Sequence, residues 1–468
     1  MTSKFGLGVM AGGSALLLAA CHQAAADLGQ EGLAGADIGL LHELVADTSA
    51  ARIETDVRKL VSFGTRHTLS DTESETRGVG AARRWIFDEF ERISADCGGC
   101  LEVMYISDTV GGERRIPDPV EVVSVVAIQR GTRDPNRMVA MSGDIDSRIT
   151  DPLNGTDDSP GANDNASGMA GVLEAARVLS KHEFAGSIVY MGLSGEEQGL
   201  FGGRIVARHA RAQGWNMKAV LNNDMIGNIT GINGVTNNTT ARVFSEGTRV
   251  VETPEEARAR RFTGGEVDSP SRNVARYVDR MADQYIPNLD VMMIYRLDRF
   301  GRGGHHRPFN EVGIPGVRIM ETNEHYDRQH QDLRNEDGRH FGDTIEFVDF
   351  DFAAKLTALN IVSMAGMALA PPVPANVSIE GAVQPSTTLK WTQATGKAAE
   401  NLQGYKIYWR LTTDAQWTRS HYVGNVSEAT LENVVIDNYF FGVASVAKNG
   451  AESPVVFPGA AGSFGDYE

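Results

Sequence analysis

Residues 168–180 read GMAGVLEAARVLS and residues 187–193 read SIVYMGL, and this pair of segments decides the fold class. In the first segment Val172, Leu173, Ala176 and Leu179 recur at helical spacing, which predicts an amphipathic helix. The second is a largely apolar run, as expected of a strand buried on both faces. A helix leading directly into a buried strand is typical of an α/β protein.

The same alternation continues on both sides of this pair. Strand-like runs occupy Glu121–Ile128, Met138–Met141, Ala219–Leu221 and Gly316–Met320. Helical periodicity is present at Arg52–Phe63, Arg77–Ile93, Leu200–Arg211 and Asp349–Leu369. Residues 231–305 show no clear period, and charged Glu252–Arg261 is expected to be a surface insertion. The alternation predicts an α/β sheet covered by helices on both faces, with ligands at the carboxyl ends of its strands.

The pattern changes after Pro371-Pro372-Val373-Pro374, which breaks the chain. Short β runs follow at Thr388–Trp391, Tyr405–Leu411 and Tyr439–Val446. Their spacing and aromatic residues resemble a fibronectin type III module, a β-sandwich of similar length. The sequence therefore predicts a main domain over residues 36–370 and an all-β fibronectin type III-like domain over 371–462, whose partner stays unknown.

Composition restricts the class of function. The chain has 468 residues, 41% hydrophobic and 22% charged, which suits a globular protein with more than one folded unit. Its formal net charge is −17, which argues against nucleic acid as a partner, because phosphate binding needs a basic surface. Clustered carboxylates in so acidic a chain can still bind metal ions.

The N-terminus is typical of an export signal. Lys4 is followed by a short apolar stretch that ends Leu18-Ala19-Ala20-Cys21, too short for a conventional transmembrane helix. This ending resembles the bacterial lipobox, which implies a signal peptide over 1–20, a lipid anchor at Cys21 and a tether over 21–35. With His22 rather than Asp after the cysteine, the resemblance implies the outer membrane facing the periplasm. An ordinary secretory signal is the alternative.

Cys97 and Cys100 lie close together in Cys97-Gly98-Gly99-Cys100. In an oxidising compartment a local disulfide is expected. A catalytic redox pair or a zinc knuckle is disfavoured, because the sequence shows neither a thioredoxin-like pattern nor two further ligands nearby.

Acidic residues follow several of the predicted strands. They lie in the segments Ser142-Gly143-Asp144-Ile145-Asp146, Ala162-Asn163-Asp164-Asn165, Gly195-Glu196-Glu197-Gln198 and Asn222-Asn223-Asp224, and a later segment, Tyr326-Asp327-Arg328-Gln329-His330, adds a histidine. Carboxylates that converge at one sheet edge repel each other and are costly to desolvate unless a positive ion neutralises them. Carboxylate and imidazole ligands together suit zinc. Any one of these acids alone is more simply a solvated loop residue, but the ordered set predicts a metal site.

These segments resemble the two-zinc aminopeptidase family, which includes bacterial leucyl aminopeptidases, plasma glutamate carboxypeptidase and glutaminyl cyclases. The motifs are residues 160–168 and 195–200, and the likeness covers roughly 50–365. It implies a three-layer α/β/α sandwich with a mixed, largely parallel sheet of the zinc exopeptidase type. The implied site residues are Asp164 bridging two zinc ions, Glu197 and His330 completing one site, Asp144 and Asp224 in the other, Glu196 as general base, and Asp146 orienting the first ligand.

Two positions depart from the family pattern. Asp144 stands where the family usually has histidine, which favours harder ions such as manganese at that position. His305, in Gly303-Gly304-His305-His306, stands where relatives commonly have an acid. The two exchanges are expected to compensate if the residues are neighbours, and a separation above about 10 Å would exclude this hypothesis.

The function expected from these observations is aminopeptidase activity: hydrolysis of peptide N-termini by water that two metal ions activate, with Glu196 as base. Three alternatives remain open. They are a carboxypeptidase or a glutaminyl cyclase on the same fold, and a non-catalytic surface lipoprotein in which the altered ligands have abolished activity.

Overall fold

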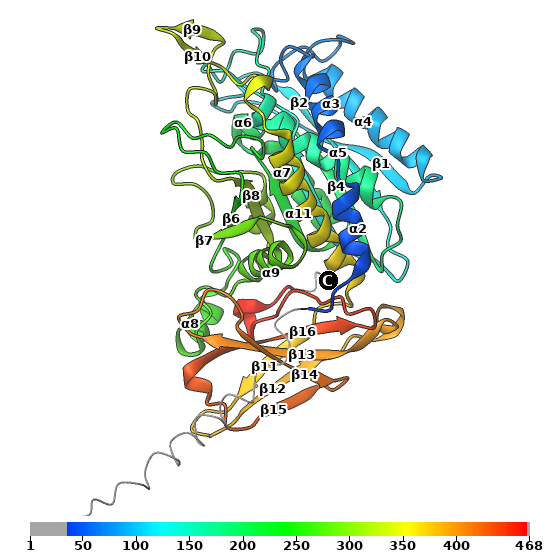
Figure 1. Cartoon of the computed structure of the whole chain (residues 1–468), viewed down its shortest axis with the longest axis vertical. Helices are drawn as coiled ribbons and strands as arrows, with labels where there is room; N and C mark the ends of the chain where they lie inside the picture. Colours follow the sequence, from blue (N-terminus) through cyan, green and yellow to red (C-terminus); the bar gives the residue numbers. More distant parts are fainter. Residues whose placement is uncertain (1–34, 466–468) are drawn as a thin grey trace, which may run out of the picture.

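The computed structural model describes residues 35–465. The predicted signal peptide, the lipid anchor at Cys21 and nearly all of the tether lie outside the described residues. Figure 1 shows two units, an α/β unit and a smaller all-β unit beneath it. Cys97 and Cys100 form a disulfide, as expected from their spacing.

An eight-stranded sheet forms the centre of the larger unit, in the order β1-β2-β4-β3-β5-β8-β6-β7. The strands are β1 (Leu101–Val110), β2 (Val120–Gln129), β3 (Asp134–Asp144), β4 (Gly186–Leu193), β5 (Asn216–Asn223), β6 (Thr240–Ser245), β7 (Asp290–Ile294) and β8 (Gly316–Glu321). The pairs β4·β3, β3·β5, β5·β8 and β6·β7 are parallel, and the others are antiparallel. The predicted mixed, largely parallel sheet is confirmed.

Helices cover both faces of this sheet. They are α2 (Gly39–Asp47), α3 (Ala50–Val61), α4 (Gly78–Asp96), α5 (Gly168–Leu179), α7 (Phe201–Ala212), α9 (Pro270–Tyr285), α10 (His306–Glu311) and α11 (Phe350–Leu369). The short helix α6 (Glu196–Gly199) precedes α7, and α8 (Pro254–Thr263) has no buried residue and lies beside the C-terminal unit. Two short helical turns, η1 (Ala162–Ser167) and η2 (Ile345–Phe347), and a hairpin of β9 (Arg334–Glu336) and β10 (Arg339–Phe341) complete the larger unit.

The two hydrophobic cores follow from side-chain alternation along the strands. Ile188 and Tyr190 of β4 point into one core with α2–α5, α9 and α11, whereas Val189 and Met191 point into a second core with α7 and α10. The strands are buried on both faces because they separate these two cores, and this explains the apolar run from which the fold class was predicted.

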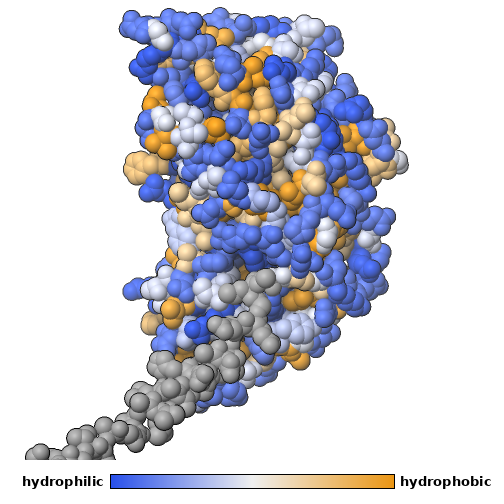
Figure 2. Space-filling model, in the orientation of Figure 1, coloured by the Kyte–Doolittle hydropathy of each residue, from blue (hydrophilic) through white to orange (hydrophobic). Residues whose placement is uncertain are grey.

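The face shown in Figure 2 is mostly hydrophilic, with hydrophobic residues scattered over it. Within residues 35–465, α11 is the one helix long and apolar enough to cross a membrane by length and composition. It packs against α5 and α9, and most of its residues are buried, so it is a core helix.

The C-terminal unit consists of two three-stranded antiparallel sheets, β11-β12-β15 and β14-β13-β16. Its elements are β11 (Ala375–Glu380), β12 (Thr387–Thr392), β13 (Leu402–Leu411), β14 (Arg419–Gly424), β15 (Glu428–Leu431) and β16 (Tyr439–Ala447), with short turns η3 (Gly396–Ala399), η4 (Ile436–Asn438) and η5 (Ala460–Gly462). The predicted boundary at 370/371 falls between α11 and β11. The assignment to the fibronectin type III class stays a prediction.

The C-terminal unit is attached to the α/β unit through α9, which lies directly above it in Figure 1. Asp268, fully buried just before α9, accepts hydrogen bonds from Arg276 of α9 at 2.8 Å and from Arg410 of β13 at 2.8 and 2.9 Å. Arg280 of α9 reaches Glu452 at 2.8 Å. Two buried carboxylates, Asp268 and Glu452, therefore join the two units through α9, and α9 belongs to the core.

We expect Asp268→Asn to lower the free energy of unfolding by about 3 kcal/mol, because it leaves two buried guanidinium groups without their counter-charge. Glu266→Gln removes a nearby exposed acid whose closest cation, Arg260, is 3.6 Å away, and it should change stability by less than about 0.5 kcal/mol. Urea unfolding followed by circular dichroism compares the two. Equal midpoints for both variants would contradict the role given to Asp268.

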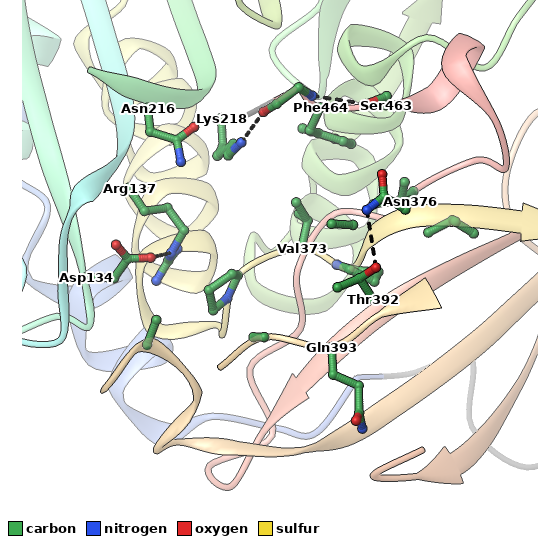
Figure 3. Close-up of a pocket in the computed structure, with 18 of the residues that line it drawn as sticks. Asp134, Arg137, Asn216, Lys218, Val373, Asn376, Thr392, Gln393, Ser463 and Phe464 are labelled. Atoms are coloured by element: carbon green, nitrogen blue, oxygen red, sulfur yellow. Dashed lines mark hydrogen bonds and ion pairs between the residues drawn. The ribbon is translucent and has the colours of Figure 1, made fainter. Parts of the chain in front are cut away.

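A cavity of about 950 Å³ lies between the two units. Figure 3 shows Asp134, Arg137, Asn216 and Lys218 of the α/β unit on one side and residues such as Asn376 and Thr392 of the C-terminal unit on the other. Asp134 and Asn216 are the first residues of β3 and β5. The C-terminal unit therefore lies at the amino ends of these parallel strands, the opposite edge from the predicted site, and does not shape the site entrance.

Candidate metal centre

The acids singled out in the sequence meet at one edge of the sheet. Asp144 is the last residue of β3, Glu196 and Glu197 begin α6 just after β4, and Asp224 follows β5. Since β4, β3 and β5 are parallel neighbours, their carboxyl ends lie together. Asp164 joins them from η1, between β3 and α5. Apart from the partly exposed Glu196, these acids are buried.

Asp164, Glu197 and His330 form a close group of possible ligands. His330 Nε2 lies 2.9 Å from Asp164 Oδ2 and 2.9 Å from Glu197 Oε1. The three donor atoms all lie within 4.8 Å of one another. One imidazole and two carboxylates match the donor set of a catalytic zinc site, which uses three protein ligands and leaves a position for water. The residues present therefore fit a zinc ion here.

Charge within this group holds a proton on the histidine. Burial lowers the pKa of His330, but Glu197 and Asp164 raise it to about 9. Burial raises the pKa of Asp164, but the positive charge of His330 outweighs it and leaves the pKa below its usual range. An ion that binds to Nε2 must displace this proton, so affinity for the ion rises with pH through this range.

A guanidinium group orients Glu197 and lies beside His330. Arg148 donates from Nε to Glu197 Oε2 at 2.7 Å, and its Nη2 lies 2.6 Å from His330 Nδ1. Arg148 follows the Asp144-Ile145-Asp146 segment, so the loop after β3 reaches across to the ligands of other elements. Sequence analysis did not single out Arg148, because a lone arginine in a loop carries no recognisable motif.

The backbone around Asp164 is held by a residue far along the chain. Asp343 accepts hydrogen bonds from the amides of Asn163, at 2.9 Å, and Asp164, at 2.6 Å. Buried Arg66 donates to the carbonyl oxygens of Pro160 and Gly161, at 2.6 and 2.8 Å. These two charged side chains fix the position of Asp164, and neither was predicted.

Asp146 supports the turn that carries the two glutamates. Its carboxylate accepts from the amides of Glu196 and Glu197, at 3.2 and 3.1 Å, and from Thr68 Oγ1 at 3.1 Å. The resemblance implied that Asp146 orients the ligand at position 144. The structure instead gives it contacts to the 196–197 backbone, because residue 144 is an aspartate and has no ring N–H to offer.

Glu196 lies beside the three-ligand group in an acidic surrounding. Burial raises its pKa well above the usual range, and the charges of Asp224 and Glu197 add to this. A carboxylate with a raised pKa next to a metal site is suited to accept a proton from water.

Asp144 and His305 are in direct contact. His305 Nδ1 lies 2.6 Å from Asp144 Oδ1, and the side chains are 0% and 2% exposed. Asn165 Nδ2 donates to Asp144 Oδ2 at 2.7 Å. The two departures from the family pattern thus share one neighbourhood, well inside the 10 Å limit stated above. Burial lowers the pKa of His305 to about 4, so its ring is neutral at physiological pH.

Asp224 is paired with arginine. Arg318 Nη2 lies 2.7 Å from Asp224 Oδ2, and Arg299 Nη2 lies 3.7 Å from the same oxygen. Among residues 35–465, no group of three donors within 4.8 Å includes Asp144 or Asp224. These two residues, expected to hold a second ion with Asp164, therefore do not form a comparable site.

Known proteins resemble this chain over most of its length. Residues 124–348 match the model of peptidase family M28. A "probable zinc metalloprotease" of Leptosphaeria maculans is 42% identical over 89% of this chain and 96% of that protein. One of the same name from Pyrenophora tritici-repentis is 41% identical over 89% of this chain and 86% of that protein.

The structure has the fold of solved aminopeptidases. The LapA aminopeptidase of Legionella pneumophila matches with a TM-score of 0.53 and 19% identity, over 71% of this chain and 73% of that one. This likeness concerns the fold alone. The curated relatives are fungal, so they do not support the bacterial origin or the outer-membrane address expected from the N-terminal motif.

Proposed function

Because the chain belongs to peptidase family M28, we propose that it is a zinc-dependent exopeptidase that removes residues from the N-termini of peptides. The observation that carries the proposal is the group of Asp164, Glu197 and His330 with Glu196 beside it at the carboxyl edge of the sheet. The contacts of Asp144 and Asp224 favour one ion over the two that the family resemblance implies.

Zinc, when bound, lowers the pKa of a water molecule and polarises the carbonyl of the scissile peptide bond. Glu196 accepts the proton of the attacking water and returns it to the leaving nitrogen, so the base is regenerated in each turnover. Asp146 keeps Glu196 in place through the 196–197 amides, and Arg148 keeps Glu197 in place.

Glutaminyl cyclisation is the second candidate. The presence of one three-ligand group at this edge of the sheet favours it, because that reaction uses one zinc ion on this fold and needs no hydrolytic water. The two activities differ in their products, since a hydrolase releases an amino acid and a cyclase releases ammonia and leaves pyroglutamate on the peptide.

We expect the zinc-loaded chain to hydrolyse aminoacyl p-nitroanilides and to lose this activity after treatment with a chelator. N-acetylated versions of the same substrates should not react, and glutaminyl peptides should yield free glutamine rather than ammonia. Release of C-terminal residues from N-acetylated peptides would instead indicate a carboxypeptidase. Pyroglutamate would indicate a cyclase, and no reaction with any substrate would support a non-catalytic role.

A further inference from the structure

We propose that this site holds a single metal ion, at Asp164, Glu197 and His330, and that Arg318 provides the positive charge that a second ion would place beside Asp224. The inference rests on the proposed function in that both assign the zinc ion to this group. It goes further by assigning a role to a residue outside every motif of the sequence.

Arg318 is built into the site rather than resting against it. It lies on β8 and pairs in register with Asn222 of β5, two residues before Asp224, which places Asp224 diagonally opposite on the neighbouring strand. Its side chain is 0% exposed. Besides Asp224, it contacts the Asp298 carboxylate at 3.3 Å and donates to the Gly303 carbonyl oxygen at 2.9 Å. These contacts fix the guanidinium in one position.

A guanidinium stays charged at any physiological pH. Arg318 and Arg299 therefore neutralise Asp224 and Asp298 permanently, without an ion from solution. Paired metal ions in hydrolases lie roughly 3.5–4 Å apart and stabilise the attacking and leaving oxygens. They also neutralise the clustered acids that bind them, which would otherwise repel one another. Where protein cations already balance those acids, that reason for a second ion is removed.

Asp144 is also engaged by the protein. One carboxylate oxygen faces His305 Nδ1 at 2.6 Å and the other accepts from Asn165 at 2.7 Å. Both partners are buried, so an ion would have to replace hydrogen bonds that water cannot restore. Asp144 is thus held by hydrogen-bond donors on both sides.

Two atoms argue for a second ion. Asp224 Oδ1 and His305 Nε2 are buried and have no hydrogen-bond partner, as expected of unused ligands. However, among residues 35–465 no group of three donor atoms within 4.8 Å includes Asp224 or His305. Zinc normally takes at least three protein ligands, so these two atoms do not make a site.

The direct test is the metal content of the full chain. Protein stripped with a chelator is reloaded with excess zinc, desalted, and analysed by elemental mass spectrometry. We expect one zinc per chain. Cobalt-loaded protein should show the electron paramagnetic resonance signal of isolated high-spin ions at full intensity per cobalt. Two retained ions, or the loss of signal that a coupled pair produces, would overturn the proposal.

Variants at Arg318 test its role. Arg318→Met removes the charge and should raise the zinc content toward two, whereas Arg318→Lys keeps the charge and should stay at one. Arg302→Met is the matched control, because Arg302 contacts Glu324 and Gln329 and should also stay at one. A folded Arg318→Met protein that retains one ion would overturn the role of Arg318. If the Arg318→Met protein does not fold, the number of zinc ions bound by the wild type and by Arg318→Lys decides whether the proposal holds.

The outcomes separate this inference from the proposed function. One ion per chain without peptide hydrolysis would support the single site and overturn the peptidase. Two ions per chain with hydrolysis would overturn the single site and support the peptidase.

Discussion

Glu196→Gln is expected to lower kcat by a factor of roughly 10²–10⁴ and to leave the bound zinc unchanged, since the loss of a general base has effects of this size. Glutamine has nearly the same shape but cannot accept the proton of the attacking water. Glu197, one residue further, would still bind the ion. Steady-state kinetics together with metal analysis of the same samples separates a lost base from a lost ligand.

The pH dependence gives this prediction a second readout. Glu196 acts as a base only when deprotonated, and burial with the charges of Asp224 and Glu197 raises its pKa. In the wild type, kcat/KM should therefore fall as the pH is lowered through that pKa, and the residual activity of Glu196→Gln should lack this fall. Glu246→Gln, at a half-buried glutamate just after β6, is the control and should keep full activity. Full activity in Glu196→Gln would remove it as the base.

Asp164→Ala is expected to weaken zinc binding by more than about 100-fold, the upper range seen when a residue that only supports a ligand is lost. The reason is that Asp164 is one of only three side chains in the ligand group. Titration of stripped protein with zinc in competition with a coloured chelator measures the dissociation constant. Hydrolysis should fall to background at zinc concentrations that saturate the wild type.

Asp343→Asn is the comparison variant, because it removes a residue that supports the ligand rather than the ligand itself. Asp343 contacts the amides of Asn163 and Asp164 but no ligand atom of the group, so its loss should weaken zinc binding by roughly 10- to 100-fold. If Asp164→Ala binds zinc as tightly as the wild type, Asp164 is not a ligand. If Asp343→Asn binds zinc more weakly than Asp164→Ala does, the assignment of Asp164 as a ligand and Asp343 as its support is wrong.

Most of the fold was predictable because the larger unit has strong periodic signals. The predicted helix at 168–180 is α5, and the strand at 187–193 is β4. Helix α9 was missed, because Arg272 and Arg276 interrupt its apolar pattern yet are almost completely buried. Their N–H groups donate to carbonyl oxygens of other segments, such as those of Ser245 and Ala415, which no local pattern reveals.

In the candidate site, too, residues placed by local patterns were predictable and residues placed by long-range contacts were not. The acids at the ends of β3, β4 and β5 were predictable from position, since parallel strands bring their carboxyl ends together. The contact between Asp144 and His305 was anticipated from two compensating departures at positions far apart in the sequence. Arg148, Arg318 and Asp343 were not predicted, because their contacts with the site residues span 49 to 182 residues of chain. Such pairings depend on strand order, which the sequence leaves open.

The position of the C-terminal unit has a practical consequence for work with this protein. The first described residues, Gly35 and Ala36, accept hydrogen bonds from Gln284 at the end of α9, and Gly465 accepts one from Lys218 beside the cavity between the units. Both ends of the described chain therefore leave the molecule at the edge of the sheet remote from Glu196 (Figure 1). Attachment of the protein to a bead or sensor chip through either end would leave the entrance for peptides turned toward the solution.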